Sequence, residues 1–372
     1  MDEEQEQNRL EEAALAIQIA VLCVLLRRLR KLTPGTTYAM ARALETQDMA
    51  EVERLLEQGR ELVADRAGEL VEDAAKDCDE WAAAFYAAAG KEQVPALEGM
   101  ASGQVVRAAK AAADKEVRRL CDSSVIQLMA NDGRIVPFKQ EFRAIVDGGI
   151  RALTRGDDVF YEYVRKTAER LGKTGLKVRY ESGTTRDLYS ALAQNVMDTA
   201  ARTQADIREL QGQEFGADGY AVSAHPYCAK DHLDYQGREF SKSEFENVQS
   251  GLRRPFGKWN CRHLVTPVII GVSPKFYSAE ERAEFRRLST RKTGVLNASG
   301  KDMTAYEFTQ WQRQRETSIR KLRAAAYLND AAGVDSAKIN AKVKELEADY
   351  FAKSKAAKIK DRRERMRVFV LD

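Results

Sequence analysis

Apolar residues recur three and four positions apart along most of the 372-residue chain, with polar residues between them. The stretch MAEVERLLEQGRELVADRAGELVEDAA (49–75) is typical of this pattern, which predicts helices with one buried face. We therefore predict helix after helix from residue 36 to about 213, interrupted by one short β-like piece, KVRYESG (177–183). The expected breaks between helices lie at Gly90, Asn131-Asp132-Gly133, Gly148-Gly149 and Gly172–Gly175.

The most apolar run of the chain is AALAIQIAVLCVLL, residues 13–26. It belongs to a predicted helix over 3–32 that ends at Thr33-Pro34-Gly35. The run is shorter than the ~20 residues that span a bilayer, and acidic residues precede it while basic residues follow it, opposite to a signal peptide. We expect a helix that needs a partner, either the protein's own core or a docking surface, and we do not expect a membrane partner.

Residues 214–276 differ in composition from the rest of the chain, with six glycines and four of the seven prolines. Within them GYAVSAH, GREFS and HLVTPVII predict short strands. Capping-box patterns at Thr184–Asp187 and Thr304–Glu307 predict two helix starts on either side, and a last helix is expected over 336–366.

These patterns predict a mostly α protein with a small α+β module, in which long helices flank a short-stranded insert rich in Gly and Pro. Four segments are expected. They are an N-terminal apolar helix (1–35), a helical domain (36–213), the small α+β module (214–276) and a basic helical C-terminal region (277–372).

Charge is unevenly distributed along the chain. The net charge is only +3, yet residues 281–372 carry 22 Lys and Arg against 13 Asp and Glu. Such a basic region is typical of a nucleic-acid contact, although a solvated helix end has the same composition. The candidate DNA contacts are Lys353, Lys355, Lys358, Lys360, Arg362, Arg363, Arg365 and Arg367.

The most unusual chemistry lies in HPYCAKDH (225–232) and WNCRH (259–263). These two stretches hold all three histidines and two of the five cysteines, whereas the other cysteines occur singly in helical patterns and act as small apolar residues. Cys and His are the ligands that zinc prefers, but the spacing here is irregular. The candidate ligands are His225, Cys228, His232, Cys261 and His263.

Two other interpretations of this cluster stay open. Asp231-His232, Asn260 and His263 superficially resemble a His-Asn-His metal nuclease, but Asn260 and His263 are too close in sequence for that hairpin, and the sequence has no phosphate-binding loop or nucleophile elbow. Alternatively, the polar side chains form hydrogen bonds that hold turns together in a small domain.

The two stretches SAHPYCAKDHLDYQGREFS and GLRRPFGKWNCRHLVTPVIIGVS resemble the phage minor capsid protein 2 family, which is related to the Mu F-like head morphogenesis proteins. The helix TAYEFTQWQRQRETSIRKLR resembles the family's downstream helix, so the resemblance covers about residues 185–325. The matching motif residues are Ser223, His225, His232, Gln236, Gly237, Trp259, Asn260, Cys261, Arg262 and His263.

One departure concerns zinc. Where relatives tend to have Ala-Arg-Pro, this chain has Cys228-Ala229-Lys230, so a zinc site that depends on Cys228 would not be a family feature. We therefore expect the hydrogen-bonded skeleton, no stoichiometric zinc and no other cofactor.

The resemblance implies a non-enzymatic structural component of a tailed-phage or prophage head. It would associate with the portal, act in head morphogenesis, and contact or travel with packaged DNA without sequence specificity. Its partners would be portal and capsid proteins, and its location the virion near the portal, with the host cytoplasm during assembly. The alternative is a toxin-like or nuclease-like effector, carried in the virion, that uses the cluster at 225–263.

Overall fold

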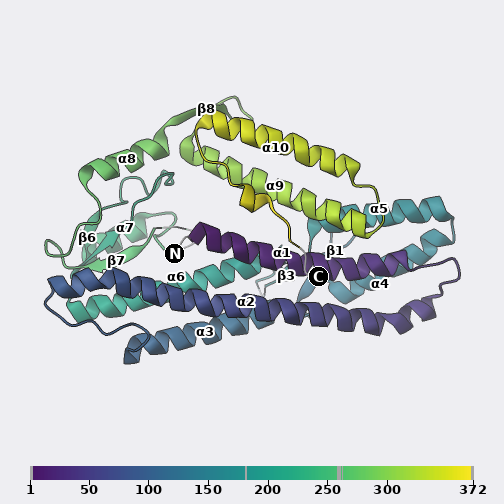
Figure 1. The fold of residues 1–372 in the computed structure, drawn as a ribbon, viewed down its shortest axis with the longest axis horizontal. Coiled ribbons are helices and arrows are strands. Elements are labelled where there is room, and N and C mark those ends of the chain that lie inside the picture. The colour runs from purple at the N-terminus through teal and green to yellow at the C-terminus, as the bar shows by residue number, and fades with distance from the viewer. Residues whose placement is uncertain (1–2, 181, 258–260, 262, 370–372) are drawn as a thin grey trace.

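Long helices dominate the computed structural model, which describes residues 3–180, 182–257, 261 and 263–369 (Figure 1). This agrees with the predicted fold class. The helices of the described part are α1 (Glu3–Arg30), α2 (Tyr38–Ala88), α3 (Met100–Leu120), α4 (Phe138–Leu153), α5 (Asp157–Thr174), α6 (Leu188–Phe215), α7 (Lys242–Gly251), α8 (Ala279–Thr290), α9 (Ala305–Ala331) and α10 (Ala337–Ala357), followed by a 3₁₀ turn, Arg363–Met366.

Helix α1 lies at the centre of the molecule, between α2 and α6 on one side and α9 on the other (Figure 1). Every side chain from Ala14 to Leu26 is at most 9% exposed, as expected for a helix that is apolar all round. The main apolar cluster joins these side chains to residues of α2, α4, α5, α6 and α9. The apolar run is therefore internal core, and it leaves no exposed apolar face for docking on a partner.

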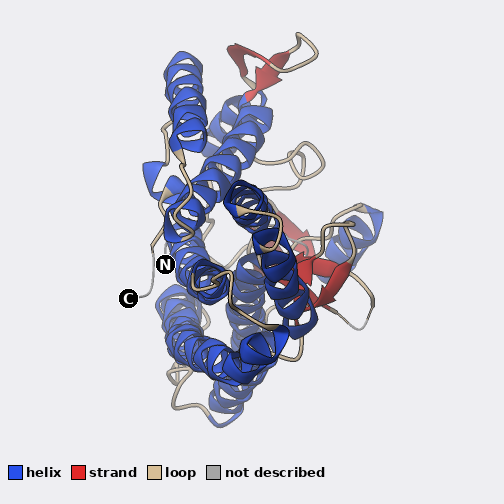
Figure 2. Ribbon diagram, turned by 90° about the vertical axis from the view of Figure 1, so that its right-hand side faces the viewer, coloured by secondary structure: helices blue, strands red, loops and turns tan. Residues whose placement is uncertain are grey.

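The strands are short and lie beside the helices (Figure 2). They form three antiparallel sheets, ordered β2-β1-β3-β4, β6-β5-β7 and β8-β9. Only β3 and the strands of the middle sheet were predicted from the sequence. The strands are β1 (Ile126–Met129), β2 (Ile135–Pro137), β3 (Lys177–Arg179), β4 (Thr185–Asp187), β5 (Gly219–Val222), β6 (Glu239–Ser241), β7 (Val265–Val268), β8 (Lys292–Leu296) and β9 (Asp302–Thr304).

The predicted helix break at Gly148-Gly149 is wrong, because both glycines lie inside α4. Their role is close packing. A Cβ atom on Gly148 would lie 2.3 Å from the hydroxyl oxygen of Tyr163, and one on Gly149 would lie 2.9 Å from a methyl carbon of Leu29. The missing side chains let α4 approach α5 and α1 closely, and this requirement outweighs the low helix propensity of glycine.

Of the two predicted capping boxes, the one at Thr304 forms, with Glu307 completing it. The one at Thr184–Asp187 does not, because residues 185–187 pair with β3 instead. The Asp187 carboxylate accepts hydrogen bonds from Lys177 and Lys321 rather than capping α6.

The predicted last helix also ends earlier than expected. Helix α10 stops at Ala357, where Lys358 adopts a left-handed conformation with φ of 53°. The chain then turns back along α9 through the 3₁₀ turn. The basic stretch after Lys358 therefore does not continue the α-helix that the sequence predicted to residue 366.

The sheet β6-β5-β7 and helix α7 lie at one end of the molecule, against the ends of α2 and α6 (Figure 1). Ala221 and Val268 of the sheet share an apolar cluster with Phe85 of α2 and Phe215 of α6. The division into four segments stays a prediction, but α1 and this sheet both bury their apolar side chains against the central helices.

Because Leu25 is fully buried at the centre of this core, Leu25→Ala should lower the free energy of unfolding by about 2–5 kcal/mol. Leu62→Ala is the matched control, since Leu62 is 49% exposed on α2, and it should cost less than about 1 kcal/mol. Chemical denaturation of the isolated protein measures both, and equal losses would contradict the assignment of α1 as core.

Candidate functional site

Two chain segments meet at the end of the sheet β6-β5-β7, and the candidate residues lie on them. The first segment leaves β5 at Ser223, and the second leads into β7. Ser223 joins them, because its backbone N–H donates to the carbonyl of Leu264 at 2.9 Å and its hydroxyl accepts from the Leu264 N–H at 2.8 Å. These bonds hold the segment 224–237 opposite Cys261 and His263.

Gly237 closes the first segment with a positive φ of 69°. Its N–H donates to the carbonyl of Val222, and a Cβ atom there would lie 2.8 Å from the side chain of Arg282. Backbone conformation and space together require glycine, so this motif residue has a structural role.

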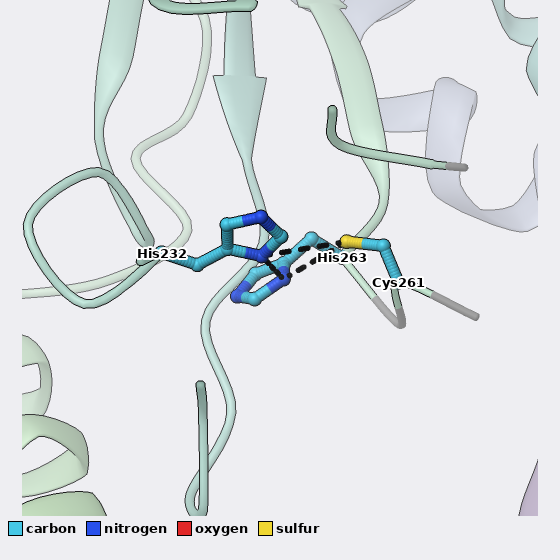
Figure 3. A group of neighbouring side chains, drawn as sticks. All are labelled: His232, Cys261 and His263. Atoms are coloured by element: carbon cyan, nitrogen blue, oxygen red, sulfur yellow. Dashed lines mark hydrogen bonds between the residues drawn. The ribbon is translucent and has the colours of Figure 1, made fainter. Parts of the chain in front are cut away.

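His232, Cys261 and His263 point toward one another (Figure 3). The Nδ1 atoms of the two histidines are 3.3 Å apart, and the Cys261 sulfur lies 3.6 Å from His232 Nδ1 and 3.3 Å from His263 Nδ1. The histidines are only 1% and 3% exposed, whereas Cys261 is half-buried.

The other two candidate ligands, Cys228 and His225, do not belong to this group of three. The Cys228 sulfur is 3.5 Å from His263 Nε2, and Nδ1 of His225 is 2.9 Å from the carbonyl oxygen of Pro226. The five candidate ligands therefore do not share one centre. Three converge on the Nδ1 side of His263, and two do not.

Gln236 and Arg254 hold the two buried histidines in place. The Gln236 amide oxygen accepts from the backbone N–H of His225 and lies 3.3 Å from His263 Nε2. The carbonyl oxygen of Arg254 lies 2.7 Å from His232 Nε2. Arg254 was not predicted, because a backbone carbonyl leaves no signal in the residue type.

Burial sets the charge state of this site. It lowers the pKa of His263 to about 2, with the neighbouring His225 and His232 adding to the effect. Burial also raises the pKa of Cys228 to about 12 and raises that of Cys261. Both effects favour the neutral forms, the imidazole of His263 and the thiols of Cys228 and Cys261.

Three motif residues, Trp259, Asn260 and Arg262, lie outside the described residues, so the structure does not test the superficial resemblance of Asn260 to a nuclease residue. Asp231, the acidic residue of the nuclease-like set, forms an ion pair with Arg254 at 3.2 Å, and its second carboxylate oxygen lies 3.8 Å from His232 Nε2.

The eight basic candidates near the C-terminus fall into two groups. In the first, Arg362 and Arg365 bind the carboxylate of Glu316 at 2.9 Å and 3.0 Å. The Tyr350 hydroxyl donates to the same carboxylate at 2.7 Å. Glu316 is 1% exposed, so these two arginines neutralise a buried charge and fasten the C-terminal segment to α9.

The other six basic candidates lie at or near the surface. Lys353 pairs with Asp349 at 2.8 Å, and Arg363 lies over the ring of Phe351. The remaining four basic candidates are exposed, and they are Lys355, Lys358, Lys360 and Arg367.

The model of the family described as phage minor capsid protein 2 matches residues 16–371. The chain belongs to this family. This confirms the resemblance and extends it from the middle of the chain into the N-terminal helices, which the sequence motifs did not cover.

Neither the curated proteins nor the solved structures include a match to the chain. As a member of a minor capsid protein family, the chain is a component of the phage capsid and therefore of the virion, with capsid proteins as its partners. Within the described part of the chain, no helix combines the length and the apolar character that crossing a membrane requires.

Proposed function

We propose that the protein is a structural, non-enzymatic component of the portal vertex in a tailed-phage or prophage head, where it acts in head morphogenesis. The observation that carries this proposal is the family match over residues 16–371. It leaves almost no part of the chain to a separate catalytic domain.

The shape of the helical body supports a bridging role. Helix α2 has 51 residues and is therefore about 75 Å long. Helices α1 and α6 run alongside it (Figure 1). A long, internally packed rod of this kind is suited to hold two components at a fixed separation, for example a portal and the inner capsid shell.

The alternative, an effector that uses the cluster at 225–263, receives less support. An enzyme acting on DNA must bring its catalytic groups to the strand. His232 and His263 are almost completely buried, and both ring Nε2 atoms lie within hydrogen-bonding distance of protein oxygens. The cluster therefore favours a structural role over a catalytic one.

Portal association is tested by cross-linking mass spectrometry and asymmetric reconstruction of purified particles. We expect cross-links to the portal protein and density at a single vertex, and we expect particles assembled without the portal to lack the protein. Density distributed over the whole shell, or normal incorporation without a portal, would contradict the proposal.

We further propose that the exposed basic residues near the C-terminus contact packaged DNA. Lys355, Lys358 and Lys360 are exposed and form no ion pair with any carboxylate among the described residues. Exposed lysines without an ion-pair partner contribute affinity for DNA through phosphate contacts, without sequence specificity.

The triple variant with Lys355, Lys358 and Lys360 changed to Gln should bind duplex DNA more weakly than the native protein. If each lysine contacts one phosphate, the slope of log affinity against log salt should decrease in magnitude by about 2–3. Binding measurements across a salt series determine this slope.

The matched control changes Lys115, Lys173 and Lys242 to Gln, since these lysines are also exposed, form no ion pair among the described residues and lie outside the C-terminal region. Equal salt slopes for both triple variants and the native protein would reject the tail as the contact. Truncation is a poorer test, because losing Arg362 and Arg365 leaves the buried Glu316 unpaired, at a cost of about 3–5 kcal/mol.

A further inference from the structure

The three side chains that converge in Figure 3 have the separations of a metal site. Tetrahedral zinc with nitrogen and sulfur ligands places two nitrogens about 3.3 Å apart and a nitrogen and a sulfur about 3.6 Å apart. The corresponding distances here are 3.3 Å between the Nδ1 atoms, and 3.6 Å and 3.3 Å from the Cys261 sulfur to His232 and His263.

The hydrogen-bond partners fix the tautomer of His232. Its Nε2 lies 2.7 Å from the carbonyl oxygen of Arg254, which can only accept. Nε2 therefore carries the proton, and Nδ1 of the neutral ring presents a bare lone pair toward His263.

Hydrogen-bond partners also fix the tautomer of His263. The Gln236 amide oxygen accepts from the His225 backbone N–H at 3.2 Å, which fixes the orientation of the amide. This oxygen also lies 3.3 Å from His263 Nε2, so Nε2 must be the donor. The Nδ1 atom of His263 is then a second bare lone pair, 3.3 Å from the first.

Without a cation, these atoms share too few protons. The two Nδ1 atoms and the Cys261 sulfur are all acceptors, and the only proton between them belongs to the Cys261 thiol. It can satisfy one nitrogen, which leaves the other facing a lone pair inside the protein. A buried acceptor without a donor is unfavourable, and a bound cation would remove that cost.

We propose that His232 Nδ1, His263 Nδ1 and the Cys261 thiolate bind one zinc ion, with a water molecule at the fourth position. On binding, the thiol proton is released to solvent, because the thiolate is the ligand. No further His, Cys, Asp or Glu side chain among the described residues joins these three. This proposal replaces the sequence-based expectation of a metal-free cluster.

Cys228 is not a ligand in this arrangement, although the sequence pattern includes it. Its sulfur lies beside His263 Nε2, on the far side of the ring from the zinc position, and its thiol donates to the carbonyl of Ala229. The donor set is therefore independent of Cys228.

The surroundings of the three donors are those of a zinc site. Each histidine directs its second ring nitrogen to a protein oxygen, Arg254 for His232 and Gln236 for His263, and such partners orient metal-binding histidines. The ion would join the segment after β5 to the segment before β7. The module's own apolar cluster is small, and the sheet makes further apolar contacts with α2 and α6.

The first test is the metal content of the full-length protein, purified without chelators under reducing conditions. Elemental analysis should give about one zinc per chain, and X-ray absorption at the zinc edge should give one sulfur neighbour and three nitrogen or oxygen neighbours. Elemental analysis that finds no zinc would overturn the proposal. So would an X-ray absorption spectrum that indicates no sulfur neighbour, or two, around the zinc.

The second test compares two matched cysteine variants after replacing zinc with cobalt(II). Cys261→Ser should lose the thiolate-to-cobalt charge-transfer absorption, whereas Cys228→Ser should retain it at one cobalt per chain. The reverse result would disprove the ligand assignment. Circular dichroism of both variants verifies folding, and the native-protein measurements decide the question if Cys261→Ser does not fold.

Discussion

The burial of the apolar helix α1 is the constraint on which the rest of the structure depends. Thirteen consecutive residues, Ala14 to Leu26, are apolar except Gln18, and all are at most 9% exposed. A helix with this surface must be covered on every side, and α2, α4, α5, α6 and α9 cover it. The one amide within it, Gln18, accepts a hydrogen bond from the backbone N–H of Leu176, so its buried oxygen is paired.

Buried ion pairs then fix the register of the helices around this core. Arg28 of α1 binds Asp48 of α2 through two hydrogen bonds of 2.5 and 2.7 Å, and Arg320 of α9 binds Glu11 of α1 at 2.5 Å. Removing one partner of such a pair leaves a buried charge, so sliding of one helix along another is strongly disfavoured. This links α9, and the C-terminal segment fastened to it through Glu316, to the N-terminal helix.

The sequence predicted the features that depend on local pattern. Apolar periodicity located the long helices, and alternation with turn residues located β5, β6 and β7. The sequence-based prediction failed where contacts between residues far apart in the chain determine the structure. At Gly148, for example, the absence of a side chain makes room for Tyr163. At the candidate site, residue types identified the five possible donors. Only the three-dimensional arrangement separates His232, Cys261 and His263 from Cys228, because that choice depends on which nitrogen of the His263 ring each sulfur approaches.

Hydrogen exchange of the backbone amides, followed by mass spectrometry, tests most directly the claim that α1 is the core of a single packed structure. If α1 is covered on every side, its amides from residue 14 to 26 should exchange only through global unfolding. They should therefore be the slowest of the chain, and slower than those of α3, which lies at the outer edge of the bundle (Figure 1). Exchange of α1 as fast as that of α3 would contradict the account.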